Sequence, residues 1–391
     1  MASRKKIAAV ITEYRVPAHA DVIVGKFIKG FPTDDGLIEP QVDIVSMYLD
    51  QIPDNDIGLQ VSEEYDIPIY QSIRAALCLG GSELAVDGVL SIGEHGSYAY
   101  NEKGQHMYPR RFFFEQICGV FSTSGRSVPV FSDKHLSYNW RDSKWMYDRA
   151  EQLGVPFMAG SSIPLGWRDP WLEHELDAPI EEALVLSFGG IESYGYHGLE
   201  ALQCMIERRS GGEAGLAAVR CLEGEAVWRA GADGLWSREL AEAAAAASET
   251  ASGSMEESCD NPAAFLLEFR DGFKATLLQL NGYAKEWSYA TRVDGQTLAT
   301  GLRTHGPPYP HFSYLGLNIE AMFLSGEPQY PVERTLLVSG ALDALMDSRH
   351  RGHIRLETPH LDVAYRSYET MPIRPTGPLP KGASTVPFDR I

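Results

Sequence analysis

The sequence predicts an α/β fold with a Rossmann-like, doubly wound parallel sheet, plus an α+β domain with an open, mainly antiparallel sheet. Three observations predict it. Short apolar runs alternate with helix-like segments over residues 6–158, which is typical of a parallel sheet covered by helices. Beyond residue 180, apolar runs follow one another with turns between them. The chain of 391 residues is also longer than a typical single domain.

Six short apolar runs are expected to form the parallel strands of the first part. Runs of this length are typical of strands buried on both faces. The strands are expected at 6–11, 43–47, 68–70, 88–92, 128–131 and 155–158. Segments with helical apolar spacing lie at 18–28, 54–65, 71–79, 112–121 and 141–153. We therefore expect right-handed crossovers with helices on both faces of the sheet.

The pattern changes after the segment 160–179, which contains several prolines and tryptophans. Later strands are expected at 183–188, 216–222, 263–269 and 274–281, with helices at 197–207 and 332–346. Residues 241–258 combine an alanine run, which could be helical, with a Ser- and Glu-containing stretch that could form a mobile connector.

These elements suggest two domains and a tail. We expect a Rossmann-like domain at 1–165 and a domain for substrate binding and dimerisation at 166–371. The Pro- and Gly-containing segment 372–391 is expected to run over the surface as an extended tail.

Charge and composition exclude several classes of protein. The net charge of −19 argues against a nucleic-acid partner, because phosphate binding requires clustered Lys and Arg. No apolar stretch is long enough to span a bilayer, and the N-terminus lacks the apolar region of a signal peptide. We therefore expect a cytoplasmic protein. The five cysteines include no Cys-x-x-Cys pair, so we expect core residues rather than zinc ligands.

Acidic residues and histidines follow three strands that a doubly wound sheet would place side by side. One follows the first strand, two follow the fourth and two follow the fifth: Glu13, Glu94, His95, Asp133 and His135. Adjacent strands lie about 4.8 Å apart, and their carboxyl ends frame the ligand crevice. Carboxylates and imidazoles together suit Mn²⁺, Zn²⁺ or Fe²⁺. We predict a divalent metal ion here; the alternative is that Glu13 simply pairs with Arg15 or Arg110.

Several segments, in order, resemble the Gfo/Idh/MocA oxidoreductase family. The segment 87–92 resembles its fourth strand. The segment 128–135 resembles its fifth, with Asp133-Lys134-His135 where the family has Glu-Lys-Pro. The segment 195–200 resembles its Gly-x-His-x-x-Asp helix start, and 333–356 its closing helix and strand. The resemblance covers almost the whole chain.

The resemblance implies a Rossmann domain, a substrate domain and NAD(P)-dependent chemistry on sugars or polyols. It also implies that Lys134 contacts substrate and that His197 gives or accepts a proton, with Glu200 as the acidic partner of His197. From the residues alone, a lysine that ends a buried strand must either be paired or become a usable base.

The first turn departs from the family. Glycines after the first strand normally let the backbone approach the dinucleotide diphosphate. Here residues 12–17 contain no glycine; Glu13 brings a negative charge and Pro17 removes a backbone donor. We therefore expect a degenerate dinucleotide site. Asp50 lies near the position of a ribose-binding acid, but reaching that position requires a one-residue slip.

Aromatic and basic residues near the crevice are candidates for substrate contacts. The insertion 96–111 could form a lid or a dimer arm. Aromatic residues after the fifth strand could form a wall for a sugar ring, or pack in the core. The candidates are Tyr98, Arg110, Arg111, Tyr138, Trp140 and Tyr196. Among the remaining histidines, we expect His19, His106, His305 and His311 at or near the surface.

Three functions remain open. The first is an enzyme acting on a sugar, polyol or hydroxy acid by metal-assisted or acid/base chemistry of the lyase, hydrolase or isomerase type. The second is an NAD(P)-dependent oxidoreductase, and the third a non-catalytic ligand-binding protein. We expect a small-molecule substrate and a homo-oligomer.

Overall fold

The first part of the chain forms a five-stranded parallel sheet. The computed structural model describes residues 4–387. The strand order is β4 (Val42–Leu49), β1 (Lys5–Ile11), β5 (Gly88–Ile92), β6 (Val130–Asp133) and β7 (Phe157–Gly160). All neighbouring pairs are parallel. The predicted neighbours β1, β5 and β6 therefore do lie side by side, and their carboxyl ends share one edge.

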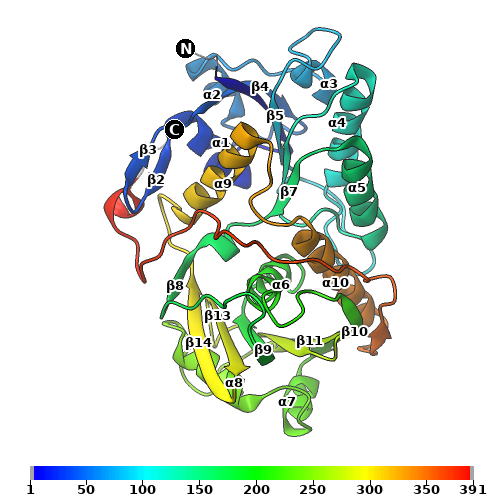
Figure 1. The fold of residues 1–391 in the computed structure, drawn as a ribbon, viewed down its shortest axis with the longest axis vertical. Helices are drawn as coiled ribbons and strands as arrows, with labels where there is room; N and C mark the ends of the chain where they lie inside the picture. Colours follow the sequence, from blue (N-terminus) through cyan, green and yellow to red (C-terminus); the bar gives the residue numbers. More distant parts are fainter. Residues whose placement is uncertain (1–3, 388–391) are drawn as a thin grey trace.

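Helices cover both faces of this sheet (Figure 1). They are α1 (His19–Lys29), α2 (Gly58–Glu64), α3 (Ile73–Leu77), α4 (Arg110–Ser124) and α5 (Trp140–Leu153). Helices α3, α4 and α5 share one apolar core with one face, whereas α1 and α2 share a second core with the other. The strand predicted at 68–70 is wrong, because that segment forms a single bridge between Ile69 and Met47.

The second part is built on an eight-stranded mixed sheet. Its order is β15-β10-β11-β12-β9-β13-β14-β8. The strands are β8 (Trp167–Asp169), β9 (Ile180–Ser187), β10 (Leu216–Glu223), β11 (Ala263–Phe269), β12 (Lys274–Gln279), β13 (Trp287–Val293), β14 (Gln296–Arg303) and β15 (Leu356–Glu357). Only β9 and β12 pair in parallel, which confirms a mainly antiparallel sheet.

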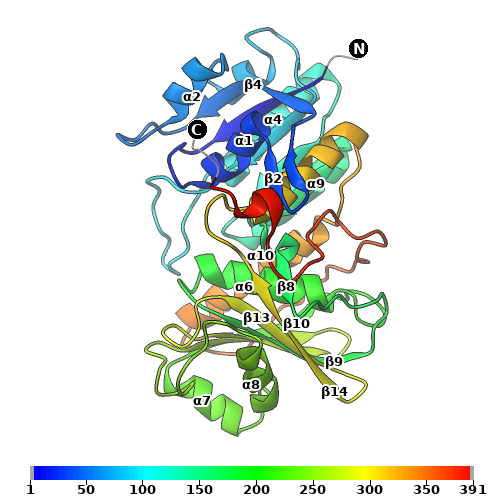
Figure 2. The same cartoon turned by 90° about the vertical axis from the view of Figure 1, so that its left-hand side faces the viewer.

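Helices lie on both faces of the second sheet (Figure 2). Helices α6 (Ser193–Ile206) and α10 (Glu333–His350) cover the face toward the first sheet. On the opposite face lie α7 (Glu225–Ala232) and α8 (Arg238–Ala246), which pack on side chains such as Leu184 and Leu186 of β9. The alanine run within residues 241–258 thus lies largely in helix α8, as expected.

Five strands and two helices of the structure were not predicted from the sequence. Strands β13 and β14 are joined by Asp294-Gly295, both with positive φ, and this dipeptide is a strong hairpin signal. A short hairpin, β2 (Phe31–Thr33) and β3 (Gly36–Ile38), follows α1. The fifth strand is the three-residue β8, and the first of the two helices is α7.

The second unpredicted helix, α9 (His311–Ser325), returns to the first sheet (Figure 1). It packs against α1 and β2 and is buried on nearly all sides, so it shows little of the polar–apolar period that reveals a surface helix. The domain bounds at 1–165 and 166–371 stay a prediction, because this later segment packs with the first part.

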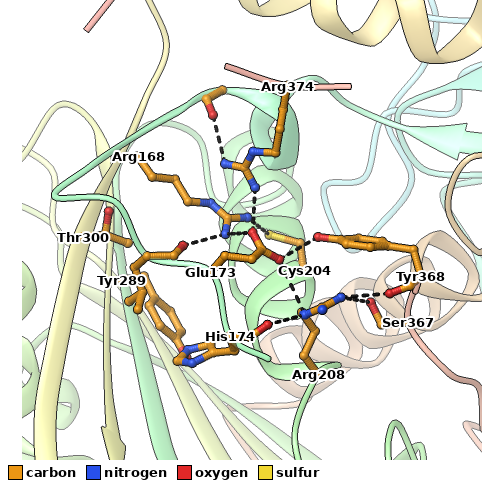
Figure 3. Close-up of polar contacts among 12 residues, drawn as sticks. Arg168, Glu173, His174, Cys204, Arg208, Tyr289, Thr300, Ser367, Tyr368 and Arg374 are labelled. Atoms are coloured by element: carbon orange, nitrogen blue, oxygen red, sulfur yellow. Dashed lines mark hydrogen bonds and ion pairs between the residues drawn. The ribbon is translucent and has the colours of Figure 1, made fainter. Parts of the chain in front are cut away.

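The C-terminal segment is anchored by a buried ionic cluster around Glu173 (Figure 3). Arg374 Nη1 lies 2.9 Å from Glu173 Oε2, and the Tyr368 hydroxyl donates to Oε1 at 2.9 Å. Arg168 also pairs with this carboxylate, and Arg208 Nε lies 3.5 Å from it. Burial, followed by the charge of Arg168, lowers the pKa of Arg374 to about 10. One carboxylate thus holds three arginines from separate segments.

Two expectations from composition can be compared with the described residues. All five cysteines are buried and free, as expected for core residues. Within residues 4–387, no helix has both the length and the apolar character needed to cross a bilayer.

Candidate functional site

A pocket of about 770 Å³ lies where the first sheet faces the second. Its walls come from the start of α1, the loops after β5 and β6, the start of α6 and the loop between β14 and α9. Lys134, Glu94, His95 and His135 line it from the first sheet, and His197 lines it from α6. The carboxyl edge of the parallel sheet therefore faces the start of α6 and the loop before α9.

Glu94 is the ionic centre of the pocket wall. Its carboxylate accepts from Lys134 Nζ at 2.9 Å and also from Arg110 Nη2. Arg110 Nη1 lies 3.0 Å from His135 Nε2. Burial alone would raise the pKa of Glu94, but the charges of Lys134 and Arg110 hold it well below the usual value. Glu94 is therefore an ionised residue that positions Lys134 and Arg110.

The other predicted metal ligands are also held by protein partners. Asp133 Oδ2 lies 2.7 Å from His19 Nδ1, and Glu13 Oε1 accepts from Arg15 Nε at 2.5 Å. Among residues 4–387, no three His, Cys, Asp or Glu side chains are grouped so that they could hold a metal ion. The predicted metal site thus receives no support, because Glu94 is paired with Lys134 and Arg110, Glu13 is paired with Arg15, and Asp133 is bonded to His19.

His197 is oriented by a chain of hydrogen bonds. Its Nδ1 lies 3.1 Å from Ser161 Oγ, and Ser161 Oγ donates to Glu200 Oε2. The Ser161 amide also donates to Glu200 Oε1 at 2.8 Å. Gly160 permits this approach, since a Cβ there would lie 2.4 Å from Glu200 Oε1. Glu200 therefore acts on His197 through Ser161, and Nε2 of His197 is left for a ligand in the pocket.

Three imidazoles of the pocket wall, those of His95, His135 and His197, have lowered pKa values and are therefore neutral. Burial lowers the pKa of His95 to about 4, and it lowers the pKa values of His135 and His197 well below normal. The positive charge of Lys134 acts in the same direction on all three. A neutral imidazole offers one donor and one acceptor, which suits recognition of hydroxyl groups.

Backbone strain gathers at the same place. His95, Lys134 and Tyr309 have φ of 68°, 60° and 53°, and all three line the pocket. Non-glycine residues in this left-handed region cost about 1–3 kcal/mol each and cluster at functional sites. The strain indicates that these side chains are held where the pocket needs them.

The fold is similar to that of several solved structures. The sequence matches no family model and no curated protein. GenD2 from gentamicin A biosynthesis, in complex with NAD, is 14% identical with a TM-score of 0.59, over 92% of this chain and 97% of that one. Scyllo-inositol dehydrogenase from Lactobacillus casei is 10% identical with a TM-score of 0.56, over 91% and 98%. Biliverdin reductase from Synechocystis, with biliverdin and NADP⁺, is 12% identical with a TM-score of 0.53, over 88% and 99%.

These neighbours share one architecture. The chain has the Gfo/Idh/MocA fold. The resemblance inferred from short motifs is thereby confirmed for the fold, and the roles of individual residues stay predictions.

The first turn lacks the glycines that bring the backbone close to a dinucleotide diphosphate. Glu13 is buried, with Tyr14 fully buried beside it, and no glycine opens the backbone between residues 12 and 17. Asp50, at the end of β4, accepts from the Tyr98 hydroxyl at 2.7 Å and from the Tyr48 hydroxyl at 2.8 Å. The insertion 96–111 thus binds Asp50, the residue that lies near the expected position of a ribose-binding acid. This insertion, which was expected to form a lid or a dimer arm, is anchored to β4 through Tyr98.

None of the six residues predicted to contact substrate lines the pocket. Arg110 binds Glu94 and His135, which themselves line the pocket. Arg111 lies over the ring of Trp145, with its guanidinium carbon 3.2 Å from the centroid. Tyr196 is fully buried.

The other aromatic candidates are used for packing between helices. Trp140 packs against Gly340 of α10, and the backbone oxygen of Tyr138 accepts from the Gln105 side chain. Trp140 therefore packs in the core, which was the alternative to a wall for a sugar ring.

Several pocket residues were missed because their partners are distant in the sequence. His19, expected at the surface, lines the pocket and contacts Asp133. His305 lies in the loop before α9, and His311 is the first residue of α9, a helix that was not predicted from the sequence. Trp287 and Tyr194 stack with an interplanar angle of 16° beside His197. The Asp294-Gly295 hairpin signal would have placed Trp287 on a strand.

Proposed function

We propose that this chain is an enzyme of the Gfo/Idh/MocA oxidoreductase type that acts on a small hydroxyl-bearing molecule in the pocket between its two sheets. The observation that carries the proposal is the meeting of Lys134, from the end of β6, with His197, from α6, across one pocket. A volume of about 770 Å³ is in the range of small-molecule sites.

Lys134 and His197 are the candidates for proton transfer. Lys134 is positioned by Glu94, and His197 by Ser161 and Glu200. The neutral His197 imidazole can take the proton of a substrate hydroxyl, and the Lys134 ammonium can donate a hydrogen bond or a proton to the substrate oxygen. Trp287 and Tyr194 supply an apolar wall, which suits the face of a sugar or cyclic polyol.

NAD(P)-dependent oxidation or reduction is the chemistry that the comparisons favour. Solved neighbours include complexes with NAD and NADP⁺. The pocket also reaches Pro17, Ala18 and His19 at the start of α1, the end of a helix that attracts anions. When bound, such a cofactor would accept or supply a hydride, while Lys134 and His197 handle the proton.

Cofactor-independent acid/base chemistry is the second candidate, favoured by the first turn. The ion pair between Glu13 and Arg15 occupies the place of a glycine loop, and Asp50 is already bonded to Tyr98. Metal-assisted chemistry is not proposed, because Glu94 and Asp133 are paired with Lys134, Arg110 and His19. A ligand-binding protein without catalysis would not need an oriented His197.

One set of measurements separates these candidates. Turnover is measured on sugars, polyols and hydroxy acids, each with and without NAD⁺ or NADP⁺. NADH and NADPH binding is followed by energy transfer from tryptophan, with Trp287→Phe to identify the donor. Dependence on added NAD⁺ or NADP⁺ together with transfer supports oxidoreduction, and turnover without either supports acid/base chemistry.

Variants test the proposed roles of the two residues. We expect Lys134→Ala and His197→Ala to lower kcat by about 10²–10⁴, the usual contribution of a general acid or base. Exposed Lys144→Ala on α5 is the matched control. Undiminished turnover in both variants would reject the proposed roles of Lys134 and His197, whereas no turnover of any substrate by the wild type would favour ligand binding.

A further inference from the structure

Glu192 is a carboxyl group in the pocket wall that the roles described above do not use. It lies directly before α6, lines the pocket and is 9% exposed. The sequence analysis did not single it out. It belongs to the second part of the chain but faces the charged residues of the first.

One oxygen of Glu192 lacks the partners that a buried carboxylate needs. Oε1 is buried and accepts no hydrogen bond from residues 4–387. Its nearest cationic candidate, His135 Nε2, lies 3.9 Å away and is within 3.0 Å of Arg110 Nη1. An ionised carboxylate in this position would leave a charge uncompensated, which is costly.

The cationic side chains near Glu192 already form ion pairs with another carboxylate. Arg110 and Lys134 both bind Glu94, whose negative charge also faces Glu192. Besides Arg110, Lys134, Glu94 and His135, the backbone amide of His106 faces Glu192 and contributes a hydrogen bond to its carboxyl group. Burial, ahead of these opposing charges, raises the pKa of Glu192 to about 7. The positive charges of Arg110 and Lys134 are thus offset by Glu94, and the surroundings of Glu192 do not favour its ionised form.

We propose that Glu192 faces the pocket as a neutral carboxylic acid and donates a hydrogen bond from Oε2 to an oxygen of the bound substrate. The buried Oε1 is then the carbonyl oxygen, for which a missing donor costs less than it would for a carboxylate. Oε2 then carries the proton, and as a hydroxyl oxygen it can accept from the His106 amide while it donates to the ligand. This inference rests on the proposal that the pocket binds a hydroxyl- or carbonyl-bearing molecule.

The protonation state is tested without any ligand. Glu192→Gln replaces the acid with a neutral group of the same shape, and exposed Glu257→Gln is the control. Because the folded pKa is raised from 4.5 to about 7, the wild type loses stability relative to Glu192→Gln as the pH rises through this window. The ratio of the two unfolding constants is expected to change by up to about tenfold per pH unit. Parallel unfolding curves across the window would overturn the proposal.

The substrate contact is tested with myo-inositol, D-glucose and D-gluconate as probes, using the fluorescence of Trp287. For the probe that binds, Glu192→Ala is expected to weaken binding about fivefold through loss of one hydrogen bond. Glu192→Gln is expected to bind at every pH, whereas wild-type binding weakens above pH 7 as the acid ionises. Loss of binding in Glu192→Gln at low pH, where the wild type binds, would overturn the proposal.

The outcomes distinguish this inference from the proposed function. Probe binding with the expected pH profile, but without turnover of any substrate, would reject the enzyme and keep the role of Glu192. If none of the probes binds the wild type, the substrate contact is rejected together with the pocket proposal. The unfolding curves then still decide whether Glu192 is neutral.

Discussion

Glu94 shows how one side chain can be mistaken for a metal ligand. Its type and its place after a buried strand suit a metal, and that is all the sequence reveals of it. The structure surrounds it with Lys134 and Arg110, so its charge is used to hold two cations in the pocket wall. The same distinction applies to Asp133, which is bonded to His19.

The pairing of Glu94 predicts how stability depends on pH. We expect Glu94→Gln to lower the free energy of unfolding by about 3–5 kcal/mol at pH 7, because it leaves buried cations without their partner. Since the folded pKa of Glu94 lies well below 4.5, its contribution is present above pH 4.5 and is lost as the pH falls through the folded pKa. Unfolding by denaturant at several pH values measures this.

Glu242→Gln provides the comparison for this experiment. Its carboxylate forms an exposed pair with Arg238 on α8, and such pairs contribute about 0–1 kcal/mol. If Glu94→Gln cost no more than Glu242→Gln at pH 7, the central role of Glu94 would be wrong.

At the scale of elements, α5 and α6 set the geometry around the pocket through their first residues. Helix α6 begins after Glu192 and presents His197 one turn later. Helix α5 begins after Asn139, whose side chain accepts from the Asp142 amide at 2.9 Å. The Trp140 amide also donates to Asp343 of α10 at 2.9 Å, so the start of α5 joins the two sheets' helices.

The cap of α5 predicts a moderate local effect. We expect Asn139→Ala to lower the free energy of unfolding by about 1 kcal/mol, the usual value of an N-cap side chain. Hydrogen exchange is expected to rise at the first turn of α5, while NADH or polyol binding stays unchanged. Asn55→Ala, at an exposed loop position, is the control. Equal stability losses in the two variants would contradict the capping role.

At the scale of the whole molecule, contacts between distant segments hold the two parts together. Helix α9 packs on α1 although it follows β14 in the chain. Glu173 joins the segment after β8 to the C-terminal residues Tyr368 and Arg374. The expected homo-oligomer stays a prediction, and α7 and α8 already cover part of the outer face of the second sheet.

The Glu173 cluster predicts that the C-terminal segment is released as a unit. We expect Glu173→Gln to cost about 3–5 kcal/mol, because three arginines lose their shared carboxylate. Limited proteolysis is expected to cut near residues 366–374 sooner than in the wild type. Exposed Glu175→Gln, two residues away, is the matched control. An unchanged cleavage pattern in Glu173→Gln would show that other contacts hold the tail.

The sequence by itself determined the parallel sheet and the direction of its carboxyl edge. Strands β1, β5 and β6 are short, apolar and followed by polar residues, and both features are local. Lys134 and His197 were found in the same way, because each lies in a motif of a few residues. The missing glycines of the first turn were also visible without a structure.

The tertiary structure decided what the charged residues do. Whether Glu94 meets a metal ion or Arg110, and whether Glu200 reaches His197 directly or through Ser161, depends on approaches between segments that are far apart in the chain. Helix α9 is buried on nearly all sides, so no alternation of polar and apolar residues marked it. Local patterns report burial and periodicity, whereas ion pairs and pocket walls arise from packing between distant segments.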